Sequence, residues 1–136
     1  LLVKVAPDFG PGELEDAVTA AVDAGAAGIV ACNTTLTRPG RDHPALREAG
    51  GLSGAPLRDL ARQTVQRVAR AVGHRVPIVG VGGVATADDA EALFDAGASL
   101  VQMYTALVFE GPGVVRRMTA ALRNRPQNGP YLCSDR

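Results

Sequence analysis

A lysine inside an apolar run is the first residue of this sequence that could do chemistry. Lys4 interrupts the run LLVKV close to the carboxyl end of a predicted strand. A buried lysine needs an anionic or strongly accepting partner, because removing an unpaired charge from water is costly. Lys4 is therefore a candidate cation that faces a ligand gaining negative charge. The alternative is a lysine on an edge strand that points into water.

Polar residues follow the second apolar run at the equivalent point. Asn33, Thr34 and Thr35 come directly after residues 28–32 and offer amide and hydroxyl groups to a polar ligand. The alternative is a turn or a helix cap, which asparagine and threonine also favour. The residues alone leave both interpretations open.

The segment GVGGVA, residues 80–85, follows a third apolar run and fits the dinucleotide-binding pattern G-x-G-x-x-[G/A]. That fold also requires an acidic residue about 20 positions later, at the end of the next strand. The next strand ends instead in Tyr104 and Thr105, and no Lys-Ser/Thr pair follows the glycines as in a Walker loop. What remains is a loop in which Gly82 and Gly83 let the backbone approach a ligand, followed by helix N–H groups for an anion. The alternative is a tight turn that needs glycine for a positive φ.

A second glycine-rich segment, GGLSG, covers residues 50–54 at the end of a long loop. It is not a serine nucleophile elbow, because Ala55 stands where G-x-S-x-G requires glycine and no strand precedes it. Ser53 is therefore not a predicted nucleophile. We expect the backbone of this loop to pass across a flat or phosphorylated ligand.

The elements that must position these residues alternate between strand and helix. Four almost continuously apolar runs are typical of strands buried on both faces: residues 1–5, 28–32, 76–81 and 99–104. A helical pattern follows each run, and Thr86 with Asp89 predicts a capping box before the third helix. This alternation predicts a parallel sheet with right-handed crossovers.

The length of the repeat distinguishes two architectures. Four units in 136 residues give 34 residues each, close to the ~31 residues per unit of a (β/α)8 barrel. The predicted fold class is thus α/β, half of a TIM barrel. If this is the C-terminal half, with strands 5–8, then the GVGG loop and Tyr104 follow strands 7 and 8. A phosphate commonly binds between those two loops in such barrels.

Charge and composition exclude several functional classes. The chain has 14 basic and 14 acidic residues and a formal net charge of zero, which argues against a sequence-independent nucleic-acid binder. Four arginines lie off the apolar stripe of the second helical pattern and indicate a solvated helix face: Arg58, Arg62, Arg67 and Arg70. No apolar run approaches the ~20 residues that a membrane-spanning helix needs.

Cysteine and histidine give weak signals. His43 and His74 stand alone and there is no C-x-x-C motif, so no metal site is predicted. Cys32 and Cys133 lie far apart, and with no secretory signal recognised they fit a reducing compartment. The chain opens on Leu1 inside a predicted strand, so we expect it to be a fragment.

Five blocks in a fixed order resemble one enzyme family. They are VKVAPD (3–8), CNTT (32–35), GGLSGAPL (50–57), VPIVGVGGV (76–84) and GASLVQMYTALVFEGP (97–112). Together they are similar to the C-terminal half of dihydroorotate dehydrogenase, in its class 2, quinone-dependent branch. The resemblance implies an FMN-containing TIM barrel that oxidises (S)-dihydroorotate to orotate with a quinone as acceptor, in de novo pyrimidine (UMP) biosynthesis. It implies a flavin-binding half-barrel over residues 1–125, and we expect a flexible tail over residues 126–136.

The resemblance also implies the residues of the site. Lys4 matches the lysine that contacts the flavin ring and favours its reduced, anionic form, while Asn33 and Thr34 match residues that bind dihydroorotate or orotate. The other cofactor positions are Cys32, Gly54, Gly83, Tyr104 and Thr105, and the last two close around the FMN phosphate. Cys32 stands where relatives often have threonine, so a hydroxyl group is lost there.

No catalytic base is assigned to this chain, because the class 2 base is a serine of the N-terminal half. That half also holds the segment that meets the quinone and the membrane. The chain alone is therefore expected to be inactive. By analogy with the family we expect peripheral attachment to a bacterial cell membrane or a mitochondrial inner membrane. The alternatives are a class 1 dihydroorotate dehydrogenase with another acceptor and a non-catalytic half-barrel that binds a phosphorylated ligand.

Overall fold

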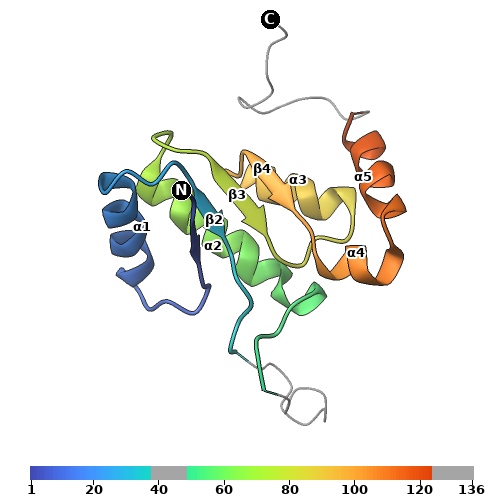
Figure 1. The fold of residues 1–136 in the computed structure, drawn as a ribbon, viewed down its shortest axis with the longest axis horizontal. Helices are drawn as coiled ribbons and strands as arrows, with labels where there is room; N and C mark the ends of the chain where they lie inside the picture. Colours follow the sequence, from blue (N-terminus) through green and yellow to red (C-terminus); the bar gives the residue numbers. More distant parts are fainter. Residues whose placement is uncertain (38–48, 124–136) are drawn as a thin grey trace, which may run out of the picture.

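Four parallel strands alternate with helices in the computed structural model, which describes residues 1–37 and 49–123 (Figure 1). The strands are β1 (Val3–Val5), β2 (Ile29–Ala31), β3 (Ile78–Val81) and β4 (Leu100–Gln102). The helices are α1 (Glu13–Asp23), α2 (Arg58–Val72), α3 (Ala87–Asp95), α4 (Thr105–Glu110) and α5 (Gly113–Arg123), and a short 3-10 helix, η2 (Ala55–Leu57), precedes α2. The predicted order of four strand–helix units is confirmed. The short helix α4 was not predicted.

The order of the strands in the sheet is the order in the chain, β1-β2-β3-β4, and every neighbouring pair is parallel. In a parallel sheet the carboxyl ends of all strands lie at the same end of the sheet. The loops that follow the strands therefore meet there, although the sequence separates them widely.

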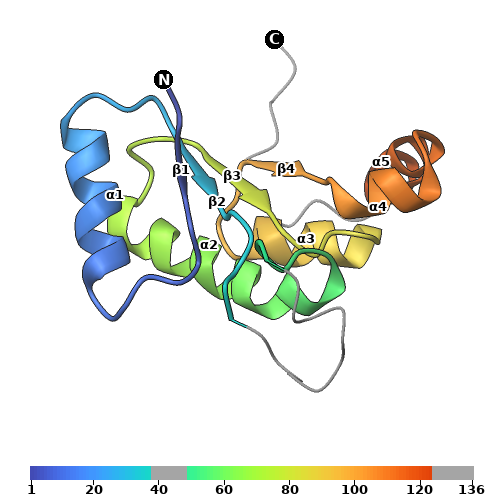
Figure 2. The ribbon, with the colours of Figure 1, turned by 60° about the horizontal axis from the view of Figure 1, so that its bottom comes forward.

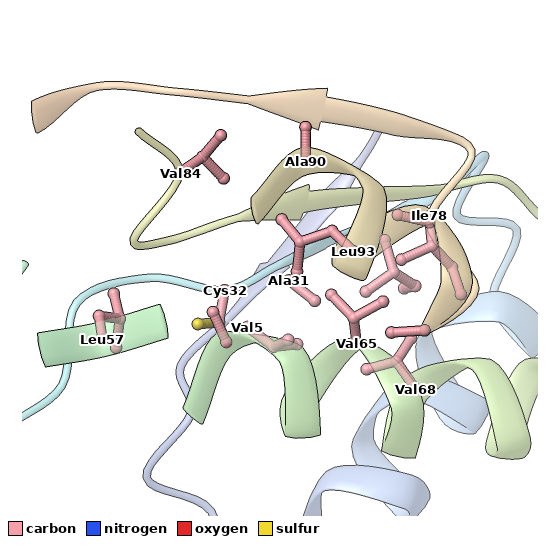
Figure 3. Close-up of a cluster of buried hydrophobic side chains, with 14 of the residues drawn as sticks. Val5, Ala31, Cys32, Leu57, Val65, Val68, Ile78, Val84, Ala90 and Leu93 are labelled. Carbon is pink, nitrogen blue, oxygen red and sulfur yellow. The ribbon is translucent and has the colours of Figure 1, made fainter. Parts of the chain in front are cut away.

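The core lies between the sheet and the helices on one of its faces. Figure 2 shows α1, α2 and α3 on that face. Apolar strand residues such as Val5, Ile29 and Ile78 are buried there with Val65 and Val68 of α2, as Figure 3 shows for part of the cluster. Because strand side chains alternate between faces, Lys4 lies on the opposite face, in register with Val30.

The predicted capping box at the start of α3 is present. Thr86 Oγ1 accepts from the Asp89 N–H at 3.2 Å, and Asp89 Oδ2 accepts from the Thr86 N–H at 2.8 Å. This reciprocal pairing satisfies donors that a helix start otherwise leaves unpaired. The start of α3 is thus fixed by local sequence.

Some predictions fall outside the described residues. His43, Cys133 and the tail over residues 126–136 are among them. Within residues 1–37 and 49–123, no three or more His, Cys, Asp or Glu side chains gather so that they could hold a metal ion. No helix in the described part of the chain is long and apolar enough to span a membrane.

Candidate functional site

Lys4 on β1 and the loops after β2, β3 and β4 line a cavity of about 640 Å³. All eight residues predicted to bind cofactor or substrate line it: Lys4, Cys32, Asn33, Thr34, Gly54, Gly83, Tyr104 and Thr105. The sheet brings these residues together because each follows, or lies near, the carboxyl end of a strand or precedes the helix behind it. Their individual roles stay predictions.

Lys4 is exposed on β1, an edge of the sheet in the described chain, and it lines the cavity. It is also the single lysine of a sequence that has thirteen arginines. An ammonium group is a compact point charge, whereas a guanidinium group is a broad planar fork. All the remaining Lys or Arg positions of this chain hold arginine, and the one lysine stands where a ligand would meet the strand. This choice favours a ligand-facing cation over a lysine that only points into water.

The three polar residues after β2 have different surroundings. Asn33 and Thr34 line the cavity, whereas Thr35 does not and is only 3% exposed. Thr35 Oγ1 donates to Asp8 Oδ1 at 2.5 Å, and the N–H of Leu36 donates to Asp8 Oδ2 at 3.2 Å. Thr35 is therefore a structural residue of this turn rather than a ligand-binding one.

Asp8 is a residue that the sequence reasoning did not single out. Its carboxylate, in the loop after β1, also accepts from Thr37 Oγ1 at 3.3 Å. It thus anchors the segment that directly follows Asn33 and Thr34. The signal in the sequence was weak, because an acidic residue in a loop is usually solvated.

The GGLSG loop is held across the end of β2. The backbones of Thr35 and Leu52 exchange two hydrogen bonds, at 3.1 and 2.8 Å, in an isolated antiparallel bridge. A Cβ atom at Gly51 would collide with the Thr34 side chain, so only glycine allows this close approach. The expected path of this loop over the ligand region agrees with the cavity, which Ser53 and Gly54 line.

The loop after β3 turns sharply over the start of α2. Gly82 and Gly83 have φ values of 125° and 70°, so the turn that needs glycine for a positive φ, given above as the alternative interpretation, is present. A Cβ atom at Gly83 would lie 2.5 Å from the Arg58 Cα, and one at Gly82 would lie 2.8 Å from the Ala61 Cβ. Both glycines are therefore required by packing on α2 as well as by the backbone conformation.

The backbone N–H groups expected to bind an anion at the start of α3 are not free. The N–H groups of Ala85 and Thr86 donate to Asp89 Oδ2 at 3.0 and 2.8 Å, and the Asp89 N–H donates to Thr86. Asp88 and Asp89 add two carboxylates to the first turn, which disfavours an anion there. The capping box thus occupies N–H groups that an anion would need.

The loop after β4 meets the GGLSG loop. Thr105, the first residue of α4, donates from Oγ1 to Ser53 Oγ at 3.2 Å, and a Cβ atom at Gly54 would lie 3.3 Å from Thr105 Cγ2. Tyr104 precedes α4 and is 75% exposed. The predicted phosphate residues Tyr104 and Thr105 thus lie on the same cavity as Gly83.

Cys32 packs into the core beside the cavity (Figure 3). It is 1% exposed, and its Sγ donates to the Val81 carbonyl oxygen at 3.7 Å. Burial raises the pKa of the Cys32 thiol to about 11, so the thiol is neutral near pH 7. The Cys32 thiol thus links the end of β2 to the end of β3. It therefore offers no free polar group for the predicted contact with a flavin.

Arg58, Arg62 and Arg70 are exposed as predicted, whereas Arg67 is partly buried, and both Arg58 and Arg67 form ion pairs that were not predicted. Arg58 Nε lies 2.7 Å from Asp89 Oδ1, and Arg67 Nε lies 2.7 Å from Glu15 Oε1. The hydrogen bond from Arg67 lowers the pKa of Glu15 to about 2. Helical periodicity placed these arginines off the buried stripe, but it could not show which neighbouring elements they reach.

Comparisons with known proteins agree in one family. Residues 1–125 match the family model of dihydroorotate dehydrogenase. A relative from Anaeromyxobacter dehalogenans (strain 2CP-C) is 60% identical over 124 residues, and one from Anaeromyxobacter sp. (strain Fw109-5) is 58% identical over 123 residues. Both are named dihydroorotate dehydrogenase (quinone). Each alignment covers 90% of this chain and 34% of the relative, so the chain spans about a third of the length of these relatives.

A solved structure shows the same fold. The crystal structure of ligand-free DHODH from Eimeria tenella matches with a TM-score of 0.87 and 36% identity, over 96% of this chain and 37% of that chain. With the parallel strand order, this similarity confirms the predicted class: the chain forms four consecutive βα units of a TIM barrel.

Proposed function

The chain belongs to the dihydroorotate dehydrogenase family, and we propose that the protein catalyses the FMN-dependent oxidation of (S)-dihydroorotate to orotate with a quinone as electron acceptor. One observation carries this proposal: the eight residues chosen from sequence line a common cavity at the carboxyl ends of the strands. The names of the relatives at 58% and 60% identity support the quinone as acceptor over the class 1 alternative.

The cavity fits FMN in size and in its polar groups. Its volume of about 640 Å³ lies within the ~300–1,000 Å³ typical of small-molecule sites. Lys4 supplies a positive charge at one strand end, and the backbones of Gly54 and Gly83 line the cavity. Thr105 adds a hydroxyl group and Tyr104 an exposed phenol beside the Gly83 loop. When bound, FMN supplies the two-electron chemistry of the reaction.

The residues of this chain bind and orient the reactants. Lys4 stabilises negative charge that develops on the ligand, through the positive charge of its ammonium group beside the cavity. Asn33 and Thr34 offer an amide and a hydroxyl group that match the polar edge of dihydroorotate or orotate. Gly83, Tyr104 and Thr105 hold the phosphate end.

Further parts of the proposal rest on the family alone. The base that removes the substrate proton is a serine outside these 136 residues, and the chain by itself is inactive. The reaction belongs to de novo pyrimidine biosynthesis. The protein attaches peripherally to the bacterial cell membrane, or to the mitochondrial inner membrane, through a segment outside this chain.

The native-length protein provides the test. Purified protein should show flavin absorbance, release FMN on denaturation, and form orotate when dihydroorotate and a short-chain quinone are added together. Activity only with a soluble acceptor would move the protein to class 1. A colourless protein that takes up no added FMN would overturn the proposal in favour of a non-catalytic half-barrel.

A further inference from the structure

One ion pair connects two walls of the cavity without lining it. Arg58 is the first residue of α2 and Asp89 lies in the first turn of α3, and Arg58 Nε lies 2.7 Å from Asp89 Oδ1. The Asp89 side chain is only 8% exposed. Its second oxygen, Oδ2, accepts from the N–H groups of Ala85 and Thr86. Asp89 therefore joins the end of the glycine loop to the start of α2.

Arg58 also contacts the glycine loop directly. Its Nε lies 3.5 Å from the Gly83 carbonyl oxygen, and its backbone occupies the space that a Gly83 side chain would need. The loop thus rests on the backbone of Arg58 and is held by its side chain. A shift of the start of α2 would move the loop with it.

This contact orients the peptide group between Gly83 and Val84. In a trans peptide the C=O and the following N–H point in opposite directions. Because the Gly83 carbonyl faces Arg58, the Val84 N–H points away from α2. Val84 lines the cavity and is 5% exposed, and its N–H has no hydrogen-bond partner among the described residues. Buried backbone donors are nearly always paired, so this donor indicates a ligand acceptor.

We propose that Arg58 and Asp89 form a positioning pair, which fixes the Gly82–Gly83 turn so that the Val84 N–H is presented to the anionic end of the ligand. Neither side chain lines the cavity, so both act through the loop. The inference rests on the proposed function, in which that end is the phosphate of FMN. In this proposal the Val84 N–H supplies the backbone donor for the anionic end. The start of α3 does not, because Asp89 and Thr86 already accept from its N–H groups.

The test compares two arginines in the native-length protein. Arg58→Ala removes the pair, and Arg75→Ala is the matched control, because Arg75 is 48% exposed against 46% for Arg58 and pairs with Asp23 at the other end of the strands. Arg58→Lys keeps the positive charge on a shorter side chain. This variant provides the test if the alanine variant does not fold. The readouts are the FMN dissociation constant of apoprotein, kcat and KM at saturating FMN, and amide hydrogen exchange of residues 82–86 without ligand.

We expect Arg58→Ala to raise the FMN dissociation constant about 10- to 100-fold, by analogy with the loss seen when residues that orient metal ligands are removed. Arg58→Lys should fall between this variant and the wild type. The KM for dihydroorotate and kcat at saturating FMN should change less than about twofold, and exchange of residues 82–86 should accelerate. Arg75→Ala should leave FMN binding and this exchange unchanged.

Two results would overturn the positioning role. One is an FMN dissociation constant for Arg58→Ala equal to that of Arg75→Ala, and the other is unchanged exchange of residues 82–86. A wild-type protein that binds no FMN would instead refute the proposed function. In that case the exchange measurement still decides whether Arg58 and Asp89 hold the loop.

Discussion

Two glycines at the amino ends of the strands differ in their surroundings from the glycines around the cavity. At the amino ends of the strands, Gly25 and Gly73 follow α1 and α2 with φ values of 93° and 58°, and a Cβ atom at either would meet nothing within 4 Å. At the carboxyl ends, a Cβ atom at Gly51, Gly82 or Gly83 would collide with a neighbouring residue. Gly25 and Gly73 are therefore required for backbone conformation alone, whereas Gly51, Gly82 and Gly83 are required for space. Close packing is not confined to the carboxyl ends, because a Cβ atom at Gly28 or Gly97 would lie 2.8 Å from Leu2 or 2.6 Å from Ala69.

The same contrast holds for the charged residues. At the amino ends, Arg75 pairs with Asp23, and both side chains are about half exposed. At the carboxyl ends, Asp8 and Asp89 each hold a loop that lines the cavity or leads into it. The loops at the amino ends of the strands therefore serve stability, and the loops at the carboxyl ends form the candidate site, as is general in TIM barrels.

The largest effect expected is that of Gly83→Ala. The new Cβ would lie 2.5 Å from the Arg58 Cα, in a backbone conformation that alanine rarely adopts. We expect loss of detectable FMN binding and a lower melting temperature. Gly25→Ala, with φ of 93° and open space, should cost about 1 kcal/mol of stability and leave FMN binding intact. Titration with FMN and thermal unfolding measure both. Equal losses of FMN binding in the two variants would erase the distinction between the two ends.

Lys4→Ala should have the next largest effect, on catalysis. It removes the single lysine of the sequence from the cavity, and loss of one group that stabilises developing charge typically costs about 100-fold in kcat. Lys4→Arg should recover only part of that loss, because the guanidinium group is larger. Steady-state kinetics with dihydroorotate and quinone give the result. Full activity of Lys4→Ala would show that Lys4 is an edge-strand residue without a role at the site.

Asp8→Asn should weaken substrate binding more than cofactor binding. The asparagine cannot accept from all three donors of residues 35–37, so Asn33 and Thr34 lose part of their support. We expect a KM for dihydroorotate about 5- to 10-fold higher, the change that corresponds to one hydrogen bond, with the FMN dissociation constant unchanged. Asp23→Asn, at the opposite end, is the control and should change neither constant. A parallel rise of both constants in Asp8→Asn would mean general loosening of the loops.

The smallest effect concerns Glu15, which lies away from the cavity. Arg67 lowers its pKa from the ordinary value of 4.5 to about 2. Since the folded pKa is depressed, the pair stabilises the fold above about pH 4.5, and this contribution is lost as the pH falls toward 2. The melting temperature of Glu15→Gln should therefore be slightly below that of the wild type at pH 6, and the difference should disappear near pH 2. FMN binding should not change at pH 6. A difference that is constant across this range would show that charge is not its cause.

Much of the fold followed from local patterns. Apolar runs predicted the four strands, and Thr86 with Asp89 predicted the capping box of α3. These features depend on residues close in the chain, so a sequence pattern captures them. The expected burial of the strands on both faces holds for β2 and most of β3 but is wrong for β1 and β4, where Lys4 and Leu100 are exposed, because these two strands lie at the edges of the sheet. Helix α4 was missed because Thr105–Glu110 is short and carries four apolar residues in succession. Such a run does not distinguish a short helix from the end of a strand.

Residues that line the site were also predicted, but the residues that hold their loops in place were not. Lys4, Asn33 and Thr34 could be chosen because their residue types are unusual after buried strands, and the ordered blocks matched a known family. Asp8 and Arg58 gave no comparable signal. Their contacts join residues 27 and 31 positions apart, to Thr35 and Asp89 respectively, and no local periodicity encodes such a distance.

The sequence by itself determined the strand–helix order, the family and, through the ordered blocks of that family, eight of the residues that line the cavity. It did so because buried strands, caps and close-packed glycines each restrict residue type locally. Only the tertiary structure decided that Thr35 supports the turn instead of lining the cavity, and that Arg58 reaches Asp89. The physical reason is that hydrogen bonds and ion pairs are satisfied by whichever groups folding brings within about 3 Å, and the parallel sheet gathers those groups from distant loops.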